Sequence, residues 1–129
     1  MKELLLTINV KCLEPLYVKG KNSAVNMVPF TGSASGRIFE GIVLPYACDT
    51  QRFEEGKDAN LSARYMLEGT DSTGQKCRIF IDNSCCDESG WHPQIVTDSK
   101  AYAYLEERPL LATVEGAEDG VTVNIYDNS

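Results

Sequence analysis

The chain has 129 residues, of which 43% are hydrophobic and 24% are charged. This length and composition predict one soluble globular domain, residues 1–129, and exclude a disordered chain. The formal net charge is −7, and residues 82–129 carry 10 acidic but only 2 basic groups. This acidic surface excludes nucleic acid and anionic membranes as partners, because phosphate binding requires clustered Lys and Arg.

The N-terminal segment MKELLLTINVKC differs from a secretory signal, because polar residues interrupt its apolar run and no small-residue cleavage site follows. No stretch of the sequence approaches the length of a membrane span. We therefore expect a cytoplasmic protein. Its five cysteines are expected to be reduced thiols, since disulfides are rare in reducing compartments and an odd count leaves one unpaired.

The first half of the chain contains two predicted strands. Apolar side chains occupy every second position of residues 4–10, which puts Leu4 on the inner face and Leu5 on the other. Residues 36–45 are rich in Ile, Val and Phe and form the second strand. The preceding TGSASG (31–36) lacks the Lys and the following helix of a phosphate loop, so we interpret it as a flexible turn.

Two hairpins are the clearest elements of the second half. Residues 61–69 and 76–83 flank TDSTG, which is dense in turn formers. Residues 110–116 and 121–127 flank AEDG, whose Asp-Gly pair favours the positive φ of a tight turn. Short strands with turn signals at this spacing predict an all-β barrel or sandwich.

One segment departs from the strand pattern. Residues 98–109 contain alanines, a leucine and two glutamates, and Asp98 or Ser99 is in position to cap the first helical turn. Pro109 restricts the residue before it and ends the helix. The expected fold is therefore all-β, with one short α-helix before the C-terminal hairpin.

The stretch FIDNSCCDESGWH (80–92) concentrates reactive residues, including the only tryptophan and the only histidine. Zinc sites need four N or S ligands at set spacing, whereas Cys85 and Cys86 are adjacent and would point to opposite sides of an extended chain. A nucleophilic thiol paired with His92 would need a nearby cation, yet its neighbours are acidic. We expect no metal site and no cofactor here, only a loop whose residues 91–93 pack over a barrel end.

Polar residues within the 61–69 and 76–83 strands leave two interpretations open. Arg64 and Glu68 share one face of the first strand. A barrel of eight strands either fills its interior with side chains or holds one small ligand. If the Arg64 face is the inner one, the barrel has a polar cavity. If it is the outer one, these are surface charges, and the sequence by itself favours this second interpretation.

Four segments resemble a widespread family of small bacterial and fungal proteins that is catalogued as a domain of unknown function. They are MVPFTGSASGRIFEGIVLP (27–45), DTQ (49–51), LSARYMLEGTDSTGQKCRIFIDN (61–83) and the tail 100–126. The resemblance implies a closed antiparallel β-barrel similar to allene oxide cyclase and calycin-like barrels. Barrels of this kind bind small apolar or polyketide-like molecules, and some act as cofactor-free isomerases or cyclases.

The resemblance also implies where a site would lie. It favours an inward Arg64, because a ligand-holding barrel needs polar anchors inside. The candidate ligand-binding residues are Arg64, Tyr65, Asp82 and Asn83. Asp49 and Glu68 are the candidate catalytic bases, and Arg64 would stabilise a developing oxyanion.

Three functions remain open at this point. The first is a small-molecule-binding barrel without chemistry, and the second is a cofactor-free isomerase, cyclase or lyase with a carboxylate base. The third is a structural or interaction subunit without a pocket. The sequence leaves the ligand open, and it also leaves open whether the chain is an enzyme and whether it forms a homo-oligomer.

Overall fold

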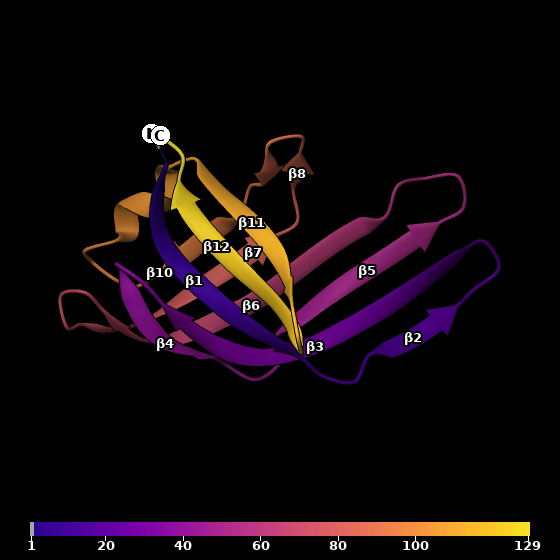
Figure 1. Ribbon diagram of the computed structural model, residues 1–129, viewed down its shortest axis with the longest axis horizontal. Coiled ribbons are helices and arrows are strands. Elements are labelled where there is room, and N and C mark those ends of the chain that lie inside the picture. The colour runs from indigo at the N-terminus through magenta and orange to yellow at the C-terminus, as the bar shows by residue number, and fades with distance from the viewer. Residues whose placement is uncertain (1) are drawn as a thin grey trace.

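The computed structural model describes residues 2–129, which form twelve β-strands and one 3-10 helix. The strands are β1 (Glu3–Cys12), β2 (Leu16–Lys19), β3 (Ser23–Ser35), β4 (Phe39–Val43), β5 (Cys48–Glu54), β6 (Asn60–Asp71), β7 (Lys76–Asn83), β8 (Cys86–Asp87), β9 (Gly90–Trp91), β10 (Gln94–Thr97), β11 (Leu110–Ala117) and β12 (Gly120–Asp127). They form one antiparallel sheet that curls into a barrel (Figure 1). The all-β antiparallel barrel expected from the sequence is therefore confirmed.

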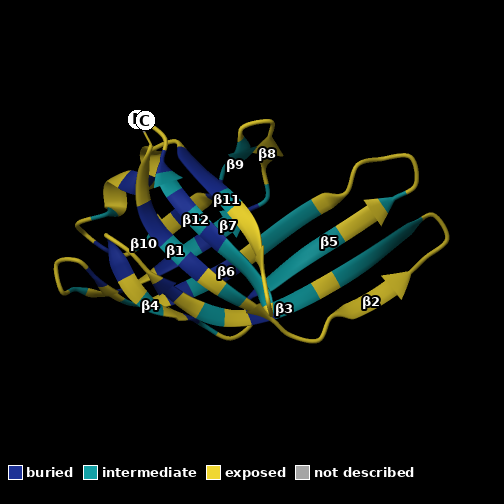
Figure 2. Ribbon diagram, in the orientation of Figure 1, coloured by how far each residue is buried: buried dark blue, intermediate teal, exposed yellow. Residues whose placement is uncertain are grey.

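The long strands β3 and β6 give the barrel two unlike halves. Their C-terminal parts pair with the short strand β4, and their N-terminal parts pair with β5. In the half that contains β4 the sheet curls tightly, whereas β2, β5 and the N-terminal parts of β3 and β6 flare outward (Figure 1). Figure 2 shows that burial follows this division, with buried residues concentrated in the tight half. We call these parts the packed half and the flared half.

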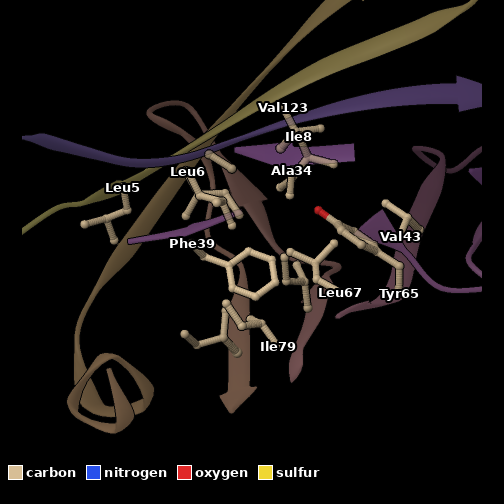
Figure 3. Packing of buried hydrophobic residues seen from close by; sticks show 14 of the residues in the cluster. Leu5, Leu6, Ile8, Ala34, Phe39, Val43, Tyr65, Leu67, Ile79 and Val123 are labelled. Carbon is tan, nitrogen blue, oxygen red and sulfur yellow. The ribbon is translucent and has the colours of Figure 1, made fainter. Parts of the chain in front are cut away.

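Apolar side chains fill the packed half. Phe39 of β4, Leu67 of β6 and Ile79 of β7 lie beside one another (Figure 3), and none is more than 3% exposed. Complete burial of such a side chain stabilises the fold by roughly 1.5–3 kcal/mol. The packed half is therefore the main source of stability, and it leaves the flared half free for other uses.

In the described part of the chain, the barrel is not closed by a continuous ladder of hydrogen bonds between strands. Across residues 2–129 no strand pairing joins β10 to β11. The β8–β9 hairpin lies against β11, because Trp91 pairs with Ala112, and the His92 N–H closes the base of the hairpin by donating to the Cys85 carbonyl. The 3-10 helix η1 (Ala103–Glu107) follows β10 in the chain and inserts Leu105, which is 1% exposed, into the core.

The α-helix predicted over residues 98–109 is wrong, since only the 3-10 helix η1 forms there. The side chains expected to cap a helix are bound elsewhere. Asp98 accepts a hydrogen bond from the Arg78 backbone N–H, and Ser99 donates its hydroxyl hydrogen to Asp71. No helix within residues 2–129 is long and apolar enough to cross a membrane.

Two smaller expectations also differ from the structure. A register shift between Leu4 and Leu6 leaves Leu4 46% exposed and buries Leu5, contrary to the prediction for these two residues, whereas Leu6 and Ile8 are buried on the predicted face. The segment 31–36 is mostly strand rather than turn, because β3 extends to Ser35. Gly32 permits this, since a Cβ atom there would lie 2.1 Å from the Asn9 carbonyl oxygen of β1.

A buried carboxylate fastens the end of the packed half. Asp71 is 5% exposed and accepts hydrogen bonds from the backbone N–H groups of Thr73 and Gln75 and from the Thr73 hydroxyl. Its second oxygen accepts from the Ser99 hydroxyl at 2.6 Å. These donors, with Ser99 and then Thr73 contributing most, lower the pKa of Asp71 from 3.8 to about 2.

Asp71 should therefore stabilise the fold in its ionised form. Because the pKa is lower in the folded chain, this stabilisation is present above pH 3.8 and is lost as the pH falls through about 2. In thermal melts, Asp71→Asn should lower the midpoint at pH 7 and flatten its pH dependence between pH 4 and pH 2. The exposed Asp58→Asn is the control, and equal behaviour of the two variants would contradict this role.

Candidate functional site

A cavity of about 220 Å³ opens in the flared half. One wall is apolar and includes Val10 of β1, Val114 of β11, and Val121 and Val123 of β12. A cavity of about 150 Å³ in another protein is large enough to bind benzene. The present cavity therefore has room for one substituted ring.

The opposite wall carries the polar groups. Asp49 of β5 and Asn83 of β7 are both paired with Ala63 of β6, so these three neighbouring positions face the same side of the sheet. All three line the cavity, and the small Ala63 side chain leaves space between the two polar ones. Tyr65 lies two residues further along β6, on the same face but closer to the packed half.

Tyr65 forms part of the cavity floor. Its ring is 5% exposed and meets the Phe30 ring edge-on, with 5.2 Å between the ring centroids. The hydroxyl points across the barrel interior toward Ile8, Ala34 and Val123 (Figure 3), and it has no hydrogen-bond partner. This burial raises the pKa of Tyr65 far above its ordinary value, so the hydroxyl stays protonated and able to donate.

Asn83 presents a second unpartnered atom. The residue is 7% exposed, and its Oδ1 is buried without a hydrogen bond. Each buried polar group left unsatisfied costs about 1–3 kcal/mol. Tyr65 Oη and Asn83 Oδ1 are the two such side-chain atoms found within residues 2–129, and both residues line the same cavity. Neither atom faces the open space of the cavity, because each has less than 1 Å² of accessible surface.

Hydrogen bonds orient the polar side chains nearer the mouth. Gln51 Nε2 donates to Asp49 Oδ2 at 3.0 Å, and Asn26 Nδ2 donates to Gln51 Oε1 at 3.3 Å. These bonds link β3 and β5 and fix the amide of Gln51. Among the side-chain hydrogen bonds found within residues 2–129, none involves Asp49 Oδ1. The Asp49 carboxylate contributes negative charge to the cavity wall.

The predicted inward orientation of Arg64 is wrong. Its side chain is 66% exposed and forms an ion pair with Asp82 at 3.4 Å on the outer face. Glu68 is also outside, where it binds Arg78 Nε at 2.8 Å. Alternation along β6 explains this result, because Tyr65 and Leu67 point inward and the residues beside them must point outward.

The structure thus separates the predicted site residues into two groups. Asp49, Tyr65 and Asn83 line the cavity, whereas Arg64, Glu68 and Asp82 lie on the outer surface. Gln51, Ala63 and Trp91 also line the cavity but were not identified from the sequence. A ligand-binding or catalytic role for the first group stays a prediction.

The stretch 80–92 forms the end of β7 and the β8–β9 hairpin. Trp91 packs against the core and lines the cavity, whereas Cys85 and Cys86 are exposed free thiols. Nowhere in residues 2–129 do three or more His, Cys, Asp or Glu side chains gather as metal ligands would. The contributions of this stretch to the cavity are therefore Asn83 and Trp91.

His92 fastens the hairpin next to the cavity. Its Nε2 lies 2.9 Å from Asp87 Oδ2, and its Nδ1 lies 3.2 Å from the Leu110 carbonyl oxygen of β11. Both partners are acceptors, so the doubly protonated ring satisfies both. The hydrogen bond to Asp87, and then the one to Leu110, raises the pKa of His92 above 6.5.

The hairpin should loosen as the pH rises through the raised pKa of His92. Because the pKa of His92 is raised by folding, its stabilising contribution is full below pH 6.5 and is lost as the pH rises through the folded value. Hydrogen exchange of residues 85–92, corrected for intrinsic rates, should show falling protection over that range. His92→Gln should remove the pH dependence, and an unchanged pH profile in this variant would contradict the assignment.

Removal of the Tyr65 hydroxyl should stabilise the empty protein. Tyr65→Phe deletes a buried donor that has no partner, so the free energy of unfolding should rise by about 1 kcal/mol. The control is Tyr102→Phe, which deletes a hydroxyl that is hydrogen-bonded to Ser72 and should lower stability. Denaturant titrations measure both, and a loss of stability in Tyr65→Phe would show that the hydroxyl has a partner in the empty protein.

Comparisons with known proteins agree with this barrel. Residues 2–84 match the family described as "Protein of unknown function (DUF3237)", and no curated protein matches the chain. A protein with unknown function from Clostridium acetobutylicum ATCC 824 is similar in structure, with a TM-score of 0.81, 20% identity, and coverage of 100% of this chain and 97% of that one.

Two further solved structures show the same fold. A β-barrel-like protein from Acinetobacter baumannii AYE has a TM-score of 0.70 at 16% identity and covers 98% of this chain and 94% of its own. An enzyme from Penicillium herquei has a TM-score of 0.67 at 14% identity, with coverage of 98% and 92%. The match over residues 2–84 shows that the chain belongs to the DUF3237 family of proteins of unknown function.

Proposed function

We propose that the protein binds one small, mainly apolar molecule in the cavity of the flared half. The observation that carries this proposal is the cavity of about 220 Å³ itself, which is largely apolar and has the polar residues Asp49, Gln51 and Asn83 in its lining. Ligand sites are typically apolar hollows with a few polar groups that fix orientation. The apolar valine wall and the polar wall opposite it match that description.

A purely structural role fits these features less well. A hollow that arose only from loose packing would be lined by apolar side chains, whereas this one has a carboxylate and two amide side chains in its lining, and burying polar groups is costly. The packed half already supplies a core of fully buried side chains.

Trp91 allows a direct test, because it is the only tryptophan and it lines the cavity. Titration with acetophenone, an uncharged single-ring probe, should give a saturable change in tryptophan emission. The thermal midpoint should also rise with probe concentration, as it does for any ligand that binds only the folded state.

Ala63→Phe should abolish both responses while the protein still unfolds cooperatively, because the new ring fills the space between Asp49 and Asn83. The matched control is Arg64→Phe, which adds the same ring at the neighbouring position on the outer face. Binding that survives in Ala63→Phe, or that is lost only in Arg64→Phe, would place the ligand outside the barrel.

A second candidate function is cofactor-free catalysis as an isomerase, cyclase or lyase. Two observations favour it: a carboxylate, Asp49, lines an otherwise largely apolar cavity, and one protein of similar fold is described as an enzyme. In this proposal Asp49 moves the proton. Glu68 and Arg64 take no part, because both lie on the outer surface.

If the protein is an enzyme, Asp49→Asn should lower its rate by on the order of 10²–10⁴-fold, the usual contribution of a general base. Glu68→Gln is the control and should leave the rate unchanged. The assay is isomerisation of unsaturated cyclic ketones and epoxides, followed by chromatography. Activity that persists in Asp49→Asn and disappears in Glu68→Gln would reverse the assignment of the base.

A further inference from the structure

We propose that the cavity selects a cationic ligand, namely a protonated amine joined by a short chain to a single ring or to an apolar body of similar size. This inference rests on the proposed function, because it specifies the charge of the molecule that the same cavity would hold. It follows from the Asp49 carboxylate, which lies in a cavity to which residues 2–129 contribute no Lys, Arg or His.

The carboxylate of Asp49 has no cationic partner in the described part of the chain. Asp49 is the one charged residue that residues 2–129 contribute to the cavity lining, and none of the ion pairs found there includes it. The basic residues of β5 and β6 point away from the cavity. Arg52 is three residues from Asp49 and Arg64 is one residue from Ala63, so alternation places both on the outer face.

The hydrogen bonds around this carboxylate orient it but leave its charge in place. Gln51 Nε2 donates to Asp49 Oδ2 at 3.0 Å, and Asn26 in turn holds the Gln51 amide. An amide donor carries no charge, whereas a Lys or Arg partner would balance the carboxylate. None of the side-chain hydrogen bonds found within residues 2–129 uses Oδ1, so this oxygen can accept from the N–H donors of an ammonium group.

The surroundings of Asp49 strengthen the preference for a cation. Its cross-strand neighbours are the apolar residues Val28 of β3 and Ala63 of β6, and both also line the cavity. Opposite charges attract more strongly beside such a lining than in open water, because less water screens them. An anionic ligand would be repelled for the same reason, and the net charge of −7 opposes it at longer range.

The rest of the lining accommodates the apolar body of the ligand. Tyr65 forms the floor against Phe30, and the valine wall closes the opposite side. Tyr65 is two residues from Ala63, the neighbour of Asp49, which is a separation of roughly 6.6 Å along a strand. A ring above the floor and an amine at Asp49 are therefore joined by one or two carbons, and the volume of about 220 Å³ admits one such ring.

The test compares four single-ring probes of similar size, namely benzylamine, benzyl alcohol, toluene and benzoate, by Trp91 emission and thermal melts. At neutral pH benzylamine is a cation and benzoate is an anion. We expect benzylamine to bind about 10-fold more tightly than benzyl alcohol, because hydrogen bonds between charged groups are stronger than those of a neutral hydroxyl. Benzoate should bind the most weakly of the four.

Two variants that remove the same charge show where the preference arises. Asp49→Asn keeps the size of the side chain, so benzylamine and benzyl alcohol should bind equally and benzoate should gain affinity. Asp82→Asn removes a carboxylate on the outer face, where it pairs with Arg64, and should leave the preference for benzylamine in place. Thermal melts without probe check that both variants fold, and the comparison of the four probes on the parent protein tests the inference without any variant.

The outcomes separate this inference from the function on which it rests. If benzyl alcohol and toluene bind and benzylamine binds no more tightly, the cavity site stands and selection of a cation is overturned. An equal loss of the preference in Asp49→Asn and Asp82→Asn would also overturn it, because the net charge of the protein would then be the cause. If no probe binds, both this inference and the proposed function are refuted.

Discussion

The inward face of β6 is the constraint on which the rest of the structure depends. This strand pairs with β4, β5 and β7, so its alternation fixes what three neighbours present to the barrel interior. Leu67 points into the packed half, Tyr65 forms the cavity floor, and Ala63 leaves the space above it. A shift of one residue would exchange these side chains for Arg64 and its outward neighbours, and would remove both the core and the cavity.

The barrel divides stability and recognition between its two halves. Phe39, Leu67 and Ile79 are almost fully buried in the packed half, and Asp71 ties its end together through four hydrogen bonds. The flared half carries half-buried strands and tolerates two polar groups without partners. Such unsatisfied groups reduce the stability of the fold. The chain tolerates them because the packed half supplies enough stability.

Much of the fold could be predicted from the sequence because hairpins are local. Strands 76–83 and 110–116 were found almost to the residue, because turn formers mark the ends of both hairpins. β2 and β5 were missed because the flared half exposes them, and exposure removes the alternation. Arg64 was placed inward because of the family resemblance. The apolar residues that alternate with it on the same strand, such as Tyr65, already indicated that it points outward. Gln51 and Trp91 reach the cavity through pairing and hairpin geometry that no local pattern encodes.

The central claim is that the cavity of the flared half holds one small, mainly apolar molecule. The most direct measurement is a crystal structure of the protein grown with acetophenone. The account predicts the ring inside the barrel, between the valine wall and Ala63. A compound bound only on the outer face beside Arg64 would contradict it.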